Sequence, residues 1–269
     1  MKKVILVTGA SSGIGLACAN ALVANGHIVY GSTRKLSRAD GVSFKPVELD
    51  VTDEVSVQAA ISLILKAEGK LDVLVNNAGN GVAGPAYAMP VEAAKKQFEV
   101  NFFGVVRMCS AVLPGMIATQ KGLIVNIGSL AGLFGLPYQS MYSASKYAIE
   151  GYSQSLRMEL INTGIKVVVI NPGDFKSFFS QNREKIAFTI NNPTLEGEYN
   201  AAITAMEKDE SVAPHPDSLA KQLCKIVDNS KPAHSYLVGG LGQTIVPTLK
   251  KILPGFLFEK LMNDHYGIK

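Results

Sequence analysis

Residue types that would fix a functional class at once are scarce in this sequence. Its 269 residues include three cysteines, Cys18, Cys109 and Cys224, which are far apart and form no C-x-x-C pair. This spacing argues against a disulfide framework or a cysteine-ligated metal site, and it fits a reduced, cytoplasmic compartment. The four histidines are equally dispersed, so no metal is expected in the site.

Strong charge and long apolar runs are also lacking. The formal net charge is +4 and the basic residues are scattered, which argues against nucleic acid as a partner. No segment reaches the ~18–20 consecutive apolar residues of a membrane span. The opening MKKVILVTGASSGIGLACANA imitates a signal peptide, but its apolar run VILV is shorter than the ~7–15 residues of a signal core. We therefore interpret VILV as a buried strand.

Short β-branched runs alternate with longer helical patterns along most of the chain. The predicted strands are residues 3–8, 27–33, 42–49, 71–76, 122–128, 165–171 and 235–239. The predicted helices are residues 13–25, 53–68, 90–117, 142–163 and 217–229. Several strands lack polar alternation, which is typical of parallel strands covered on both faces. The pattern predicts a single α/β domain with a Rossmann-type, doubly wound, seven-stranded and mostly parallel sheet, whose ligands lie beyond the carboxyl ends of the strands.

Two stretches depart from this alternation. Residues 174–215, between the sixth and seventh strands, are predicted to form a mobile cover over the substrate. The tail, residues 240–269, is apolar and basic. Two sets of its apolar residues can each share one face of a short helix: Leu249, Ile252 and Leu253, and then Phe256, Leu257 and Leu261. Packing on the domain or on a partner subunit, and docking on a membrane surface, both remain open for this tail.

A glycine-rich turn, VTGASSGIG, follows the first strand and opens a helix. Gly9 permits a tight turn, Gly13 allows close approach of a pyrophosphate, and Gly15 allows close helix–strand packing. The helix N-terminus then presents free N–H groups to the phosphates. The spacing G-x-x-x-G-x-G differs from the common G-x-G-x-x-G. The prediction of a nucleotide site therefore depends largely on the position of this turn directly after a strand.

The end of the second strand reads YGSTRK, without the carboxylate that would bind an adenosine ribose hydroxyl. Thr33 is neutral, and the Arg34 guanidinium can grip a 2′-phosphate in a bidentate manner. NADP(H) is therefore favoured, and NAD(H) is not excluded. The alternative is that Arg34 and Lys35 are solvated loop charges.

Tyr142 and Lys146 lie at i and i+4 within YSASK, one helical turn apart. An ammonium beside a phenol favours the phenolate, so we expect a lowered pKa for Tyr142 and a role as acid and base. About 0.7 such pairs are expected by chance in this composition, so the pair needs context. Ser129, at the end of the fifth strand, supplies a second hydroxyl for the same substrate oxygen.

Taken together, these motifs resemble those of the short-chain dehydrogenase/reductase family, in members of about 250 residues. The matching positions are T-G-x-x-x-G-x-G at 8–15, N-N-A-G at 76–79, Asn101, Ser129, Tyr142, Lys146 and P-G at 172–173. They occur in the family's order over residues 3 to about 177, and thirteen residues separate Ser129 from Tyr142, as is usual there.

The resemblance implies a four-residue mechanism. Tyr142 would be the acid/base, and Ser129 would polarise the substrate oxygen. Lys146 would bind the nicotinamide ribose and lower the tyrosine pKa, and Asn101 would hold a water in a proton relay. The implied cofactor-binding residues are Gly9, Ser11, Ser12, Gly13, Ile14, Gly15, Arg34, Asp50, Val51, Asn77, Ala78, Gly79, Tyr142, Lys146, Pro172, Gly173, Phe175 and Ser177. Ser177 stands where the family usually has threonine, which weakens the match there. Similar proteins form dimers or tetramers through the helices at 90–117 and 142–163.

The expected pocket wall is apolar: residues 79–90, 130–139, and Phe175, Phe178 and Phe179 of the cover. Such a wall suits a small apolar alcohol or ketone of steroid, retinoid or lipid character. The leading hypothesis is thus an NADP(H)-dependent carbonyl reductase or alcohol dehydrogenase, without a preferred direction. Alternatives are a non-catalytic nucleotide sensor or scaffold on the same fold, and a sugar-nucleotide epimerase or dehydratase. The last usually has T-G-x-x-G-x-x-G and a longer C-terminal domain, both absent here.

Overall fold

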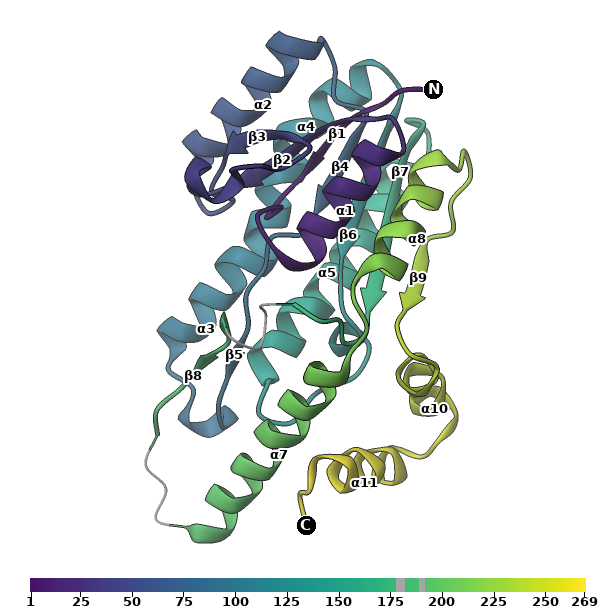
Figure 1. Ribbon diagram of the computed structural model, residues 1–269. Helices are drawn as coiled ribbons and strands as arrows, with labels where there is room; N and C mark the ends of the chain where they lie inside the picture. The colour runs from purple at the N-terminus through teal and green to yellow at the C-terminus, as the bar shows by residue number, and fades with distance from the viewer. Residues whose placement is uncertain (178–181, 189–191) are drawn as a thin grey trace.

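The computed structural model describes residues 1–177, 182–188 and 192–269. Its centre is a seven-stranded sheet in the order β3–β2–β1–β4–β6–β7–β9, with every neighbouring pair parallel (Figure 1). The strands are β1 (Val4–Val7), β2 (Ile28–Thr33), β3 (Lys45–Glu48), β4 (Val73–Asn76), β6 (Gly122–Ile127), β7 (Ile165–Pro172) and β9 (Ser235–Val238). The predicted doubly wound parallel sheet is confirmed, and all seven predicted strands are present.

The apolar character of β1 follows from burial on both faces. Val4 and Leu6 belong to one core cluster, and Ile5 and Val7 to another, because successive side chains of a strand point to opposite faces. Helices α2, α4 and α5 cover the first face, and α1 and α8 cover the second (Figure 1). Their bounds are α1 (Gly13–Ala24), α2 (Glu54–Glu68), α4 (Gly104–Ala118), α5 (Ser140–Glu159) and α8 (Asp217–Asp228).

The helix predicted at 90–117 is continuous but not uniform. It consists of α3 (Val91–Phe98), a π-helical turn at Glu99–Phe103, and α4. Its length, and the apolar character of an 18-residue window within it, would also suit a membrane-crossing helix, yet α4 packs on α2, β4 and β6. We therefore interpret it as a core helix. The π-helical turn matters for the site because it positions Asn101.

The segment 174–215 differs from its expected irregular form. It contains the two-residue strand β8 (Glu184–Lys185), which pairs with β5 (Val82–Ala83), and the 20-residue helix α7 (Pro193–Val212). Asn192 caps α7 by accepting hydrogen bonds from the backbone of Thr194 and Leu195 at 3.1 and 3.4 Å. The buried residues Tyr199, Ala202, Ile203 and Met206 follow the helical i, i+3, i+4, i+7 spacing. The signal was present but interrupted by polar residues.

The tail folds into three helices: α9 (Leu241–Thr244), α10 (Val246–Ile252) and α11 (Gly255–Tyr266). Helix α11 packs on α7 and buries Phe258, Met262 and Tyr266, not the set expected from the sequence. Phe256, Leu257 and Leu261 face solvent. Of the other expected set, Leu249 and Leu253 are half-buried and Ile252 is exposed.

Candidate active site

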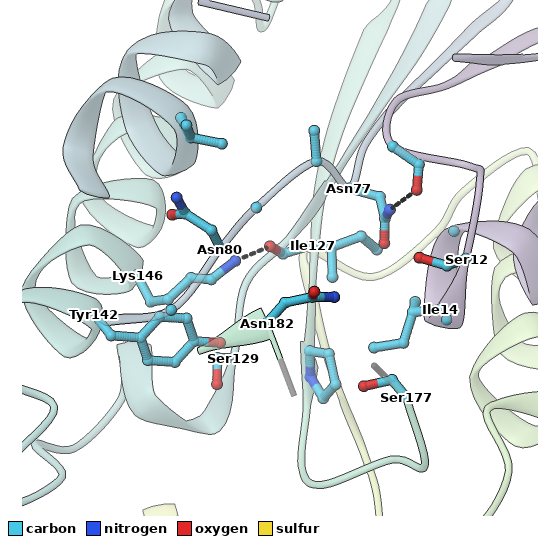
Figure 2. A pocket seen from close by; sticks show the side chains of 18 of the residues that line it. Ser12, Ile14, Asn77, Asn80, Ile127, Ser129, Tyr142, Lys146, Ser177 and Asn182 are labelled. Carbon is cyan, nitrogen blue, oxygen red and sulfur yellow. Dashed lines mark hydrogen bonds between the residues drawn. The ribbon is translucent and has the colours of Figure 1, made fainter. Parts of the chain in front are cut away.

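A cavity of about 820 Å³ lies at the carboxyl ends of the central strands. All but one of the predicted site residues line it, from the glycine turn to Tyr142 and Lys146 (Figure 2). The exception is Asn101, which is buried behind the wall. Residues 3 to 177 thus converge on one cavity, although they come from six strands and the segments that follow them. Phe178 and Phe179 lie outside the described residues.

The glycine turn has the backbone that a pyrophosphate requires. Gly9 and Gly13 have φ angles of +66° and +56°, in the left-handed region that favours glycine. A Cβ on Gly15 would lie 2.3 Å from the Gly9 carbonyl oxygen and 2.4 Å from the Asn77 amide nitrogen. Within the described residues, the Ser12 side chain makes no capping hydrogen bond, and α1 has no acidic residue in its first turn. The first N–H groups of α1 therefore suit an anion.

Asn77 holds the glycine turn to the end of β4. Its side-chain amide donates to the backbone oxygens of Thr8 and Gly9 at 2.9 and 3.1 Å. The Thr8 hydroxyl in turn accepts from the backbone N–H groups of Asn77 and Ala78, at 2.9 and 3.0 Å. Asn76 is buried and donates to Asn126 on β6 at 2.8 Å, so it joins strands as expected and does not line the cavity.

The adenosine end of the cavity carries two arginines. Arg34 was expected there; Arg38, in the 3-10 turn Leu36–Ala39, was not, although RKLSR places both on one side of a short turn. Both are exposed at the rim. The Asp50 carboxylate also lines the cavity, but it accepts hydrogen bonds from the backbone and hydroxyl of Thr52 at 2.9 and 2.7 Å. This end is consequently basic where a 2′-phosphate would lie.

At the other end, Ser129 and Tyr142 place two hydroxyl groups together (Figure 2). The Tyr142 hydroxyl hydrogen-bonds to Ser129. The Ser129 hydroxyl also accepts from the backbone of Ala131 at 3.1 Å, which fixes its rotamer at the start of a 3-10 turn. The pair faces the cavity beside Pro172 and Gly173 of the following strand end. A carbonyl oxygen placed there can receive two hydrogen bonds.

Lys146 is buried beneath this pair. Its ammonium donates to the Ile127 backbone oxygen at 2.9 Å and lies 5.8 Å from the centre of the Tyr142 ring. Burial lowers the pKa of Lys146 to about 8.

The structure contradicts the expected lowering of the Tyr142 pKa. Burial raises the pKa of Tyr142 to about 12, and the hydrogen bond from Ser129 opposes this only in part. Desolvation dominates because the phenol is enclosed while the Lys146 ammonium turns to a backbone oxygen. The phenol therefore keeps its proton at neutral pH.

Asn101 organises the loop after β4 from behind the cavity wall. Its side-chain oxygen accepts from the Asn80 backbone N–H at 2.9 Å, and its amide donates to the Asn80 oxygen at 3.0 Å and to Ser145 at 3.1 Å. Gln97, one turn earlier, also donates to Asn80. The Asn101 side chain thus fixes Asn80, which lines the cavity; a water relay through Asn101 stays a prediction.

Three carboxylates border the cavity near Tyr142: Asp174, Asp209 and Glu210, called here the carboxylate wall. Glu210 pairs with the fully buried Arg183, and Asp209 accepts from exposed His265 at 2.9 Å. Burial and the charges of Glu210 and Asp209 raise the pKa of Asp174 to about 6. The charges of Asp174 and Glu210 also act on the pKa of Tyr142, raising it.

The carboxylate wall corrects the expectation of an uncharged pocket. Residues 79–90 and 130–139 contribute Gly79, Asn80, Gly81, Leu136 and Gln139 to the cavity, and Phe175 lines it as expected. Charge enters from α7, which the sequence interpretation had missed. With α7 recognised, Asp209 and Glu210 could have been placed near the site, since they lie one turn after the buried Met206.

Comparisons with known proteins agree with this geometry. Residues 3–186 match the model of a family described as short chain dehydrogenase. The chain belongs to the short-chain dehydrogenase family. It is 40% identical to a 3-ketodihydrosphingosine reductase of Bacteroides thetaiotaomicron, over 99% of each chain. It is 35% identical to the NADPH-dependent 1-acyldihydroxyacetone phosphate reductase of Saccharomyces cerevisiae, over 99% of this chain and 92% of the other.

Among solved structures, a short-chain dehydrogenase from Streptomyces avermitilis superposes with a TM-score of 0.82. It is 30% identical and covers 99% of this chain and 97% of its own. The resemblance drawn from the motifs is therefore confirmed, and this short-chain dehydrogenase is an oxidoreductase that binds NAD(P). The glycine turn, the open N-terminus of α1 and the basic rim fit such a dinucleotide.

Proposed function

We propose that this short-chain dehydrogenase is an NADP(H)-dependent carbonyl reductase of a long-chain, lipid-like ketone. The observation that carries the proposal is the hydrogen-bonded pair of Tyr142 and Ser129, which lines the same cavity as the glycine turn. A sensor that only binds nucleotide has no need of two hydroxyl groups aimed at one point of its cavity. The assigned roles are Tyr142 as acid/base, Ser129 as the polarising hydroxyl, and Lys146 and Asn101 as supporting groups.

The reaction needs a proton donor at the substrate oxygen. A reduced nicotinamide, when bound in this cavity, would supply a hydride to the carbonyl carbon. Tyr142 gives its proton to the carbonyl oxygen as the C=O electron pair moves onto that oxygen, and Ser129 holds the oxygen during the transfer. The raised pKa of Tyr142 keeps the phenol protonated, which supports reduction over oxidation at neutral pH. Lys146, with its pKa lowered to about 8, is suited to return a proton to Tyr142.

The basic rim supports NADP(H) over NAD(H). Arg34 and Arg38 together offer two guanidinium groups to a 2′-phosphate, and Thr33 at the strand end is neutral. The Asp50 carboxylate bonds to Thr52. The name of the yeast relative, an NADPH-dependent enzyme, agrees with this preference.

The carboxylate wall distinguishes the two lipid-like substrates that the relatives' names suggest. A 3-ketodihydrosphingosine carries an amine beside its ketone, whereas 1-acyldihydroxyacetone phosphate carries a phosphate. Asp174, Asp209 and Glu210 outnumber the cations Arg183 and Lys146, so an ammonium is favoured near Tyr142 over a phosphate. A long-chain amino ketone of the sphingoid type is therefore the substrate that we propose.

A matched substrate panel tests this proposal. NADPH-linked reduction is measured with a long-chain 2-amino-3-ketone, with its N-acetylated counterpart and with a 1-acyldihydroxyacetone phosphate. We expect the free amine to have the highest kcat/KM, and acetylation to lower it at least about tenfold because the ammonium is lost. Preference for the phosphorylated ketone would contradict the substrate assignment. NADPH binding without turnover of any carbonyl would favour the non-catalytic alternative.

A further inference from the structure

The C-terminal helices carry a cluster of exposed apolar side chains that the reaction does not explain. Six residues between positions 241 and 261 form this C-terminal apolar face: Leu241, Ile245, Ile252, Phe256, Leu257 and Leu261. Leu241 is 90% exposed and Phe256 is 71% exposed. Isolated exposed apolar residues are ordinary, but six within 21 residues of one tail indicate an interaction surface.

Helix α11 has two apolar faces with different surroundings. Phe258, Met262 and Tyr266 are buried against the domain, and Tyr266 lines the active-site cavity. Phe256, Leu257 and Leu261 lie outside this buried stripe and are exposed to solvent. The second face adds nothing to packing within the chain, so it is not required for α11 to dock. Any surface that contacts α11 also lies next to an element of the cavity wall, because Tyr266 belongs to the same helix.

Positive charge accompanies this face. Lys251 lies next to Ile252, and Lys260 lies between Leu257 and Leu261; both lysines are exposed. Neither forms an ion pair in the part of the chain that the structure describes. Residues 240–269 contain four lysines against two acidic side chains, Glu259 and Asp264. Apolar side chains interleaved with lysines are typical of helices that lie in the interface of an anionic bilayer.

We propose that the C-terminal apolar face docks this protein onto the surface of an anionic phospholipid bilayer. Its apolar side chains enter the headgroup–acyl boundary, and Lys251 and Lys260 meet lipid phosphates. Lys250 stays with the domain, where its ammonium bonds to the Leu133 oxygen and to Tyr147. Because α11 also lines the cavity through Tyr266, docking places the cavity next to the bilayer.

Charge favours a bilayer over a second copy of the chain. In a twofold contact the same patch meets itself, so a tail with four lysines and two carboxylates would meet a surface of the same net sign. Anionic headgroups instead supply the opposite sign. Other exposed apolar residues, including Phe103, Met158 and Ile161, lie on or next to the π-turn–α4 and α5 segments through which similar proteins associate. These exposed residues, and not the C-terminal apolar face, are the ones that a contact of that kind would cover.

The absence of tryptophan gives a direct probe of docking. Phe256→Trp places one indole on the C-terminal apolar face, and Val55→Trp places one at an equally exposed apolar site on α2, at the far end of the sheet (Figure 1). With vesicles of phosphatidylglycerol and phosphatidylcholine, we expect a blue shift of emission for Phe256→Trp and none for Val55→Trp. The measurement needs no turnover, so its outcome is independent of the proposed reaction.

Flotation of the full chain with the same vesicles measures the strength of docking. Phe256→Ser combined with Leu257→Ser should weaken partitioning at least about tenfold, and Lys251→Gln or Lys260→Gln about fivefold each. The control Val55→Ser combined with Leu63→Ser, two exposed residues of α2, should bind as the wild type does. NADPH binding and thermal unfolding verify that each variant is folded.

Two results would overturn the proposal. One is that the wild-type protein does not float with anionic vesicles and that the emission of Phe256→Trp does not shift when they are added. The other is a sedimentation experiment in which the Phe256 and Leu257 double substitution dissociates an oligomer, which would assign the face to a second copy of the chain.

Discussion

The Lys146 ammonium donates to the carbonyl oxygen of Ile127, 2.9 Å away, and lies 5.8 Å from the centre of the Tyr142 ring. The two groups share one wall of the cavity, yet burial moves the Tyr142 pKa up and the Lys146 pKa down. The phenol is therefore protonated at neutral pH and can donate its proton. Of these two groups, Lys146 has the pKa closer to neutral pH.

Removing the Tyr142 hydroxyl should greatly slow turnover without removing the cofactor site. We expect Tyr142→Phe to lower kcat for ketone reduction by about 10²–10⁴, the usual contribution of a general acid. NADPH affinity, followed by nicotinamide fluorescence, should change less than about threefold. Tyr147→Phe is the matched control, since Tyr147 is on the same helix, is 39% exposed and bonds to Lys250 outside the cavity. A wild-type rate in Tyr142→Phe would refute the acid/base assignment.

Cofactor choice should depend on the two arginines of the basic rim. Removing a charge-assisted hydrogen bond to phosphate costs about 1.5–3 kcal/mol, so Arg34→Ala or Arg38→Ala should raise the KM for NADPH about ten- to a hundredfold. The KM for NADH, which lacks the 2′-phosphate, should be nearly unchanged. Lys35→Ala serves as the control because Lys35 does not line the cavity. Equal effects on both cofactors would show that the arginines do not read the 2′-phosphate.

Residues 3 to 177 were predictable because local pattern and tertiary role coincide there. The run VILV is apolar on both faces, and both faces are in fact buried. The glycine turn and YSASK likewise lie at the cavity by virtue of the parallel topology alone. The pKa of Tyr142 was not predictable, because it depends on how far the phenol is buried, which spacing does not reveal.

Helix α7 shows why the structure of residues 174–215 was harder to predict from the sequence. Its buried residues follow helical spacing, but Gly197 and the many polar residues hide the pattern, and packing on α11 stabilises it. The carboxylate wall was missed for the same reason. In α11, the apolar residues on two faces were equally compatible with burial, and contact with α7 selects the face of Phe258 and Met262.

Two glycine substitutions should have opposite effects on stability. Gly15→Ala places a methyl group 2.3 Å from the Gly9 oxygen, so we expect a lower Tm and loss of NADPH binding. Gly197 lies at an exposed position of α7, and a Cβ added there has no neighbouring atom within 4 Å. Gly197→Ala should therefore raise the free energy of unfolding by about 0.5–1 kcal/mol through helix propensity. Thermal unfolding and NADPH titration measure both. Tight NADPH binding by Gly15→Ala would mean that the turn can relax around the methyl group.

The carboxylate wall should couple stability to pH through Asp174. The pKa of its carboxyl is raised from 3.8 to about 6, first by burial and then by Glu210, so the folded state holds this proton more tightly than the unfolded state does. The resulting stabilisation is complete below about pH 4 and is lost as the pH rises through 6. At pH 7.5 the ionised Asp174 carboxylate, which is buried and repelled by Glu210, lowers the free energy of unfolding of the native protein.

Asp174→Asn removes that charge and keeps an oxygen to accept the Gln243 hydrogen bond, which is 2.5 Å long. We expect the variant to be more stable than the wild type by about 1–2 kcal/mol at pH 7.5, and the difference to vanish toward pH 4. Asp40→Asn, at an exposed carboxylate, should shift stability little at either pH. The same Asp174→Asn variant should raise the KM for a long-chain amino ketone and leave that for its N-acetylated form unchanged. A stability gain without this loss of selectivity would mean that Asp174 acts on the fold and not on the substrate.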